Sequence, residues 1–328
     1  MSDTPRRRKD PGVLLEEARA GDRHALARLI TGLEQGGPQS RQIAGLAYRS
    51  STEVPTVGIT GAPGAGKSTL VSRLIGQMRE GGQSIGVLAI DPTSPFSGGA
   101  ILGDRVRMQD HALDQQVFIR SMATRGHLGG LTLAVPEAVR VLAAVGLDRV
   151  VIETVGVGQV EVEVASAADT TVVVVNPGWG DSVQANKAGL LEIADIFVIN
   201  KADRPGARQT RLDLDQMLDL SQTTDWRPPI VETTATATAG DGLIDLWAAI
   251  KDHEAYLAKS GLLETRRAKR LERELRRVLT AEIDREVRRI SDEPGFSDVV
   301  KAVVAHEIDP YDAADRLIGA ALAHIKDP

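Results

Sequence analysis

Short apolar runs and longer amphipathic stretches alternate along the middle of the chain. Between residues 54 and 250 the apolar runs are rich in Val and Ile, and the stretches between them, such as 131–145 and 182–193, have apolar positions at helical spacing. Runs that are apolar throughout are typical of strands covered on both faces, and their alternation with helices predicts a mainly parallel sheet. The expected strands are Thr56–Thr60, Ile85–Ile90, Val150–Glu153, Thr171–Asn176, Ile196–Asn200 and Pro229–Thr233.

Both ends of the chain have helical patterns instead. Residues 11 to about 50 predict helices, one of them capped by Asp22 and ended by Gly36–Pro38. Residues 262–290 are dense in Arg and Glu and predict one long helix, and a break at Pro294 and a later helix capped by Asp309 follow. The long helix has a single apolar stripe, formed by Leu271, Leu275, Val278, Leu279, Ile283, Val287 and Ile290.

This stripe has two interpretations. It packs on the rest of its own chain, or it forms a contact between subunits. We favour the contact, because the helix is long and the sheet already has helices of its own. The patterns together predict three parts: an N-terminal helical extension (1–50), an α/β domain (51–255) and a C-terminal helical arm (256–328).

Composition narrows the class of protein. Of the 328 residues, 42% are hydrophobic and 26% charged, as in a water-soluble globular protein. A net charge of −6 and only 3% aromatic residues argue against nucleic-acid binding. No apolar run is long enough to span a bilayer, and no apolar segment follows the basic start Arg6–Lys9 as in a signal peptide. With no cysteine in the chain, we expect a cytoplasmic protein without a membrane partner.

The segment Gly61–Ser68 reads G-x-x-x-x-G-K-S and lies between an expected strand and an expected helix. In that context it predicts a P-loop, in which backbone N–H groups at a helix N-terminus bind phosphate oxygens. The Lys67 ammonium would reach the β- and γ-phosphates, and the Ser68 hydroxyl would bind magnesium. The expected phosphate-binding residues are Gly61, Ala62, Pro63, Gly64, Ala65, Gly66, Lys67, Ser68 and Thr69.

The segment Asn200–Asp203 reads N-K-x-D and follows the next-to-last expected strand. The Asp203 carboxylate would accept hydrogen bonds from N1–H and the N2 amino group of guanine, whereas adenine has an acceptor at the matching ring nitrogen. Asn200 and Lys201 would fix the loop and cover the base. After the last strand, a backbone N–H of Thr236, Ala237 or Thr238 would contact guanine O6.

Three carboxylates could complete a magnesium site. Glu153 ends a strand and begins E-T-V-G, where a D-x-x-G motif would lie, and the N–H of Gly156 would meet the γ-phosphate. Asp91 ends the second expected strand, and Asp104 lies in the glycine-rich loop that follows. We expect Lys67, Glu153 and Asp104 to take part in catalysis, and Ser68, Asp91, Asp104 and Glu153 to hold the metal.

These motifs resemble those of the MeaB/ArgK GTPases, a branch of the SIMIBI-class P-loop proteins. The likeness rests on the strings 58–69, 91–108, 120–126 and 153–159. It implies a P-loop NTPase fold, GTP and GDP with Mg²⁺ as ligands, and a C-terminal arm that makes a homodimer. It also implies a chaperone that binds an adenosylcobalamin-dependent methylmalonyl-CoA mutase, or a related acyl-CoA mutase, and gates the loading or protection of its cofactor.

The same likeness places a mobile loop, switch III, at Pro177–Ala188. Its polar members Asp181, Gln184 and Lys187 would signal the nucleotide state to the mutase. Three other functions stay open: a metallochaperone GTPase of the same class, a nucleotide kinase linked to amino-acid transport, and a scaffold that binds nucleotide without turnover, against which the intact Lys67, Ser68 and Glu153 argue. The first is disfavoured because the six histidines are scattered, and the second because N-K-x-D indicates a GTPase.

Overall fold

The computed structural model describes residues 9–91, 108–111, 113–123, 130–154, 167–178, 192–221, 225–237 and 240–326. Side chains are described within these ranges except at 91, 109, 130–133, 221, 294 and 320–326. The described chain divides into two compact units, Met1–Arg270 and Leu271–Pro328, and each is treated by itself below.

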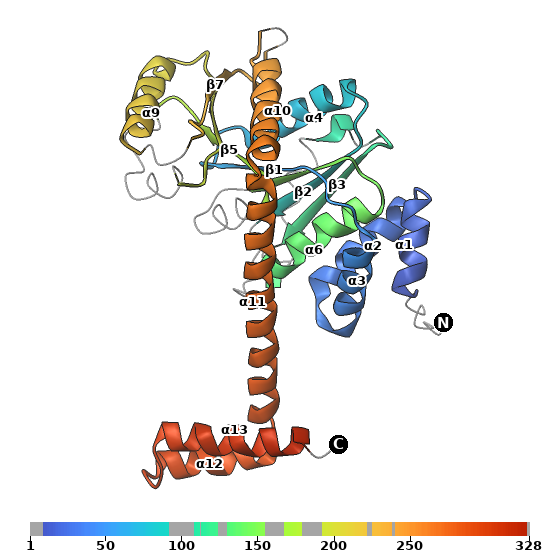
Figure 1. Ribbon diagram of the computed structural model, residues 1–328, viewed down its shortest axis with the longest axis vertical. Helices are drawn as coiled ribbons and strands as arrows, with labels where there is room; N and C mark the ends of the chain where they lie inside the picture. Colours follow the sequence, from blue (N-terminus) through green and yellow to red (C-terminus); the bar gives the residue numbers. More distant parts are fainter. Residues whose placement is uncertain are drawn as a thin grey trace, which may run out of the picture. The chain divides into compact units, whose positions relative to one another are not determined.

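The first unit is built on one parallel sheet of seven strands (Figure 1). The spatial order is β3-β2-β4-β1-β5-β6-β7, so that β1 lies in the centre with β4 and β5 as neighbours. The strands are β1 (Thr56–Gly61), β2 (Ile85–Asp91), β3 (Val117–Ala123), β4 (Arg149–Thr154), β5 (Thr170–Val175), β6 (Ile196–Asn200) and β7 (Ile230–Thr233).

The six strands expected from the apolar runs are confirmed, and each begins and ends within one residue of its prediction. The strand β3 was missed. It lies at the edge of the sheet, and its central residues Ile119, Arg120 and Ser121 are only half-buried. An edge strand covered in part lacks the continuous apolar run that revealed the others.

Helices cover both faces of the sheet. Alternate residues of parallel strands point to opposite faces, and the core follows this alternation. Val57 and Ile59 of β1 pack with α4 (Lys67–Glu80) and α10 (Leu243–Ser260). On the other face, Ile152 of β4 packs with α6 (Gly130–Ala144), and Val173 of β5 packs with α9 (Ala207–Ser221).

The N-terminal extension packs on the α6 face near β3. It consists of α1 (Pro11–Arg19), α2 (Arg23–Gln35) and α3 (Gly37–Ser50). The side chains of Leu29 and Ile30 are buried there, and Arg120 of β3 donates a 2.5 Å charged hydrogen bond to Glu34. The predicted N-cap is confirmed, because Asp22 Oδ1 accepts hydrogen bonds from the N–H groups of residues 24 and 25.

The long C-terminal helix is also confirmed. It is α11 (Leu262–Ser291), and α12 (Pro294–Val304) and α13 (Pro310–Lys326) follow it, the last capped by Asp309. No residue of α11 is buried. Within the stripe, Leu275 is 67% exposed and Val287 53%. None of the described helices combines the length and the apolar character that crossing a membrane requires.

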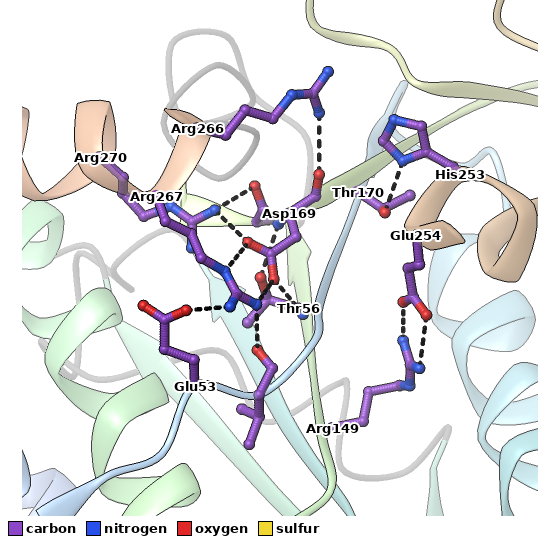
Figure 2. Close-up of polar contacts among 12 residues, drawn as sticks. Glu53, Thr56, Arg149, Asp169, Thr170, His253, Glu254, Arg266, Arg267 and Arg270 are labelled. Atoms are coloured by element: carbon purple, nitrogen blue, oxygen red, sulfur yellow. Dashed lines mark hydrogen bonds and ion pairs between the residues drawn. The ribbon is translucent and has the colours of Figure 1, made fainter. Parts of the chain in front are cut away.

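A buried polar network ties the first turns of α11 to the amino ends of the strands (Figure 2). Asp169, just before β5, accepts 2.8 Å charged hydrogen bonds from Arg267 and Arg270. Asp195, just before β6, is paired with Arg266 at 2.9 Å and with the buried His253 at 3.2 Å. All of these residues belong to the first unit, so the base of α11 is part of the sheet domain.

Candidate nucleotide-binding site

The P-loop lies at the carboxyl end of β1, in the centre of the sheet. Two of its glycines are required by close backbone approach as well as by positive φ. At Gly61 (φ 136°) a Cβ would lie 2.0 Å from the carbonyl oxygen of Val174. At Gly66 (φ 89°) it would lie 2.4 Å from Asn200 Nδ2. The loop is therefore packed directly against β5 and the end of β6.

Lys67 begins α4 and folds back over the loop. Its ammonium donates hydrogen bonds to the carbonyl oxygens of Gly61 at 2.7 Å and Ala62 at 2.9 Å, and the residue is only 6% exposed. The same turn points the N-terminal N–H groups of α4 towards the loop. A charged lysine and a helix N-terminus thus meet at one place, which suits a multiply charged phosphate.

Ser68 and Glu153 meet beside this lysine. Ser68 Oγ donates a 2.6 Å hydrogen bond to Glu153 Oε1, and both side chains are buried. Glu153 comes from β4, where it lies opposite Ile59 of β1 in the strand register. A hydroxyl and a carboxylate at the carboxyl edge of the sheet are oxygen ligands of the kind that magnesium prefers. The oxygen atoms of Ser68 and Glu153 therefore fit the predicted magnesium ion.

The N-K-x-D segment is bonded to the P-loop. Asn200 Nδ2 donates to the carbonyl oxygen of Ala65 at 2.8 Å, while its Oδ1 accepts from Thr233 Oγ1 at 3.1 Å. Lys201, which has a positive φ of 60°, reaches over and donates to the carbonyl oxygen of Gly64 at 2.7 Å. The phosphate-binding loop and the predicted base-binding loop therefore form one connected structure.

The predicted base reader and the loop after β7 lie next to this connection. Asp203 is exposed in the turn after β6, where its carboxylate can reach a ligand. Thr236 is also exposed, whereas the N–H of Ala237 donates to Thr234 O at 2.8 Å and closes a turn. Of the two described residues predicted to contact guanine O6, Ala237 therefore already uses its N–H for a hydrogen bond within its own loop.

Several predicted site residues lie outside the described residues. They stay predictions: Asp104, Gly156, Asp181, Gln184, Lys187 and Thr238. For Asp91 the backbone is described as the last residue of β2, and the side chain is not. Within the part of the chain that the structure describes, no three His, Asp or Glu side chains gather as a metal cluster.

Two residues of this region were missed by the sequence reasoning. Thr233 supports Asn200, and Arg73 of α4 donates to Ala237 O at 3.2 Å and to Asp241 Oδ2 at 2.7 Å. Thr233 could have been found as the polar end of an apolar strand. Nothing in the sequence marks Arg73, since its partners are far along the chain.

Comparison with known proteins identifies the family of this chain. The profile of the family described as Methylmalonyl Co-A mutase-associated GTPase MeaB matches residues 26–292. The chain belongs to the MeaB family. It is accordingly a GTPase that binds guanine nucleotide, and the resemblance expected from its motifs is confirmed.

Individual relatives agree with membership of the MeaB family. The chain is 50% identical over 309 residues to a candidate GTPase of Pyrococcus abyssi, with 93% of this chain and 95% of the relative covered. It is 35% identical to the mouse mitochondrial protein described as a methylmalonic aciduria type A homolog, with 75% and 64% covered. A solved structure described as a LAO/AO transport system kinase has a TM-score of 0.68 at 26% identity, with 94% and 96% covered.

Proposed function

We propose that this GTPase is a chaperone of an adenosylcobalamin-dependent methylmalonyl-CoA mutase, or of a related acyl-CoA mutase, and that GTP binding and hydrolysis gate cofactor loading. The match of residues 26–292 to a mutase-associated GTPase family carries this proposal. The mouse relative, whose description refers to methylmalonic aciduria, supports the same chemistry.

Hydrolysis rests on the residues around the P-loop. Lys67 places a positive charge where the γ-phosphoryl group develops negative charge in the transition state. Ser68 and Glu153 would hold magnesium together with Asp91 and Asp104, and the bound ion would neutralise charge on the phosphate oxygens. Glu153 lies near the end of β4, three residues before Gly156 in the sequence. A metal ion held by Glu153 would therefore be coupled to the loop whose Gly156 N–H is predicted to contact the γ-phosphate.

Guanine selection rests on Asp203. Its carboxylate would accept both donors of the guanine edge, while Asn200 and Lys201 fix the loop against the P-loop. This role of Asp203 is supported by its exposure and by its place next to Asn200 and Lys201, which bond to the P-loop. An adenine nucleotide would leave the carboxylate without its donors, and that loss disfavours ATP.

Two further parts of the proposal concern contacts with other chains. Switch III, at Pro177–Ala188, would carry the nucleotide state to the mutase through Asp181, Gln184 and Lys187. The stripe of α11 would form a homodimer, which is supported by the exposure of its leucines and isoleucine. Neither contact involves a phosphate- or base-binding residue.

The test is binding to a purified mutase. Tagged protein, loaded in turn with GDP and with a non-hydrolysable GTP analogue, is mixed with purified methylmalonyl-CoA mutase and passed over a sizing column. We expect one complex whose dissociation constant differs between the two nucleotides. The absence of any complex in both states, with correctly folded protein, would contradict the mutase-chaperone function.

A second candidate function is a kinase linked to transport, and the likeness to a LAO/AO transport system kinase favours considering it. A kinase would transfer the γ-phosphoryl group to an acceptor instead of to water. Radiolabelled γ-phosphate should therefore appear on an acceptor molecule if the protein is a kinase, and as free phosphate if it is a GTPase. Asp203, which indicates guanine, favours the second result.

A further inference from the structure

Arg73 lies on the helix that follows the P-loop and reaches the loop that follows β7. It is placed on α4 about two turns after Lys67, on a side that leaves its side chain 43% exposed. Its Nη2 donates to Asp241 Oδ2 at 2.7 Å and to the carbonyl oxygen of Ala237 at 3.2 Å. One guanidinium therefore holds both the end and the middle of the loop that precedes α10.

Asp241 organises the end of that loop. Its backbone oxygen accepts from the N–H of Thr234 at 3.0 Å, and its Oδ1 accepts from the N–H of Leu243 at 3.1 Å. Burial raises the pKa of this carboxyl, and hydrogen bonds from Arg73 and Leu243 lower it by more, so the pKa lies below its ordinary value. The carboxylate is therefore ionised at neutral pH, as an ion pair with Arg73 requires.

The start of the same loop is fixed by the N-K-x-D segment. Asn200 Oδ1 accepts from the N–H of Ala235 at 3.3 Å, and the N–H of Ala202 donates to Thr233 O at 3.0 Å. The loop is thus held at one end by Asn200, which also bonds the P-loop, and at the other by Arg73, which comes from the P-loop's own helix. The predicted contact with guanine O6 lies between these two supports.

We infer that Arg73 is a positioning residue for guanine recognition: it fixes the loop of Thr236 and Ala237 relative to the phosphate-binding helix. The inference rests on the proposed base contact of that loop. Because the Arg73 side chain is 43% exposed, its ion pair contributes little to global stability. A purely structural role of Arg73 would therefore leave nucleotide preference nearly unchanged. A positioning role instead predicts that loss of Arg73 weakens the hydrogen bond between this loop and guanine O6.

The test uses Arg73→Ala with Arg79→Ala as the matched control. Arg79 is on the same helix and pairs with Asp114 at 2.7 Å, far along the chain from the base loop. Affinities are measured for GTP, for inosine triphosphate, which lacks the N2 amino group, and for 6-thioguanosine triphosphate, which keeps the N1–H and N2 donors and replaces O6 with sulfur, a weaker acceptor. The wild type should prefer GTP to both analogues.

We expect Arg73→Ala to reduce the preference for GTP over 6-thioguanosine triphosphate by up to about tenfold, the effect of one hydrogen bond. The preference for GTP over inosine triphosphate, which reports on Asp203, should be unchanged, as should kcat at saturating GTP. Arg73→Lys, which keeps the charge but lacks the planar fork, should give an intermediate value. Arg79→Ala should match the wild type in every ratio.

Two results would overturn the inference. If the O6 preference of Arg73→Ala equals that of Arg79→Ala, Arg73 is only a surface ion pair. If the wild type itself shows no O6 preference, the loop does not read the base at all, and the inference fails together with the assignment of Thr236–Thr238. Retained discrimination against inosine triphosphate would show that Asp203 still recognises guanine in either case.

Discussion

Ser68 and Glu153 are separated by 85 residues in the chain, and their side chains share a 2.6 Å hydrogen bond. The bond joins the first turn of α4, which begins with Lys67, to the carboxyl end of β4 and brings a hydroxyl and a carboxylate together. One strand and one helix N-terminus therefore supply the charged and polar side chains of this part of the site.

Turnover should depend on this assembly. Lys67→Ala removes the charge that stabilises the γ-phosphoryl transition state, and Glu153→Ala removes a carboxylate from the proposed metal site. We expect both variants to lose measurable GTP hydrolysis, while Glu153→Ala still folds and retains some GDP binding. Phosphate release and GDP titration check this, with Glu80→Gln at the far end of α4 as the control. Normal turnover in Glu153→Ala would remove Glu153 from the site.

Guanine affinity should depend on Asp203. Asp203→Asn exchanges an acceptor oxygen for an amide donor and leaves guanine donors unsatisfied, which should cost about 2–4 kcal/mol of GTP binding. Xanthosine triphosphate, which has an acceptor at that edge, should partly restore binding. Calorimetry measures both, and Asp213→Asn on α9 is the control. An unchanged GTP affinity in Asp203→Asn would contradict the assignment.

The free energy of unfolding should fall in acid, because the pairs of Asp169 with Arg267 and Arg270 at the start of α11 depend on an ionised carboxylate. Burial raises the pKa of the Asp169 carboxyl, but the guanidinium groups of Arg267 and Arg270 lower it by more, so the native pKa lies below the ordinary value. A depressed native pKa means that the stabilisation is present above the unfolded pKa of about 3.9 and is lost as pH falls from there. Unfolding midpoints should therefore drop steeply below about pH 4.

Asp169→Asn tests the source of that pH dependence. It leaves the half-buried Arg267 and Arg270 without their shared, buried carboxylate and should cost about 3 kcal/mol at pH 7. The acid dependence should become shallower, because the titrating group is gone. Asp219→Asn, in an exposed pair with Arg227, should change stability by less than about 1 kcal/mol. Equal losses in the two variants would show that the network carries no special stability.

Self-association should depend on the stripe of α11. A charge in the centre of an apolar contact is costly, so Ile283→Glu should convert the proposed dimer into a monomer. Sedimentation velocity checks the mass, and Arg276→Gln on the same helix is a matched surface change. If Ile283→Glu sediments like the wild type, the stripe is not the subunit contact.

The sequence predicted the elements better than their contacts. Strands such as β5 and β6 are buried on both faces, so their apolar runs identify them without a structure. The edge strand β3 lacks that signal because Arg120 lies in its middle and pairs with Glu34 of α2. The long helix α11 was predicted from its 3.6-residue pattern, which does not depend on what it contacts.

For the site, motifs identified the residues but not how they are joined. P-loop and N-K-x-D residues follow from spacing, since their chemistry is local. The bonds of Asn200 to Ala65 and of Arg73 to Asp241 join parts of the chain that no local pattern connects. The predicted magnesium ligands illustrate the same limit: the sequence offered Asp91, Asp104 and Glu153, and no local pattern shows that Glu153 bonds to Ser68.

The most direct test of the mutase-linked switch is GTP turnover with and without purified mutase. Alone, the wild type should hydrolyse GTP far more slowly than the roughly 10 per second of assisted GTPases, and mutase should accelerate it. The variant with Asp181, Gln184 and Lys187 replaced by Ala should bind GTP normally and lose that acceleration. Equal acceleration of both proteins would show that switch III does not carry the signal, and no acceleration of the wild type would contradict the account itself.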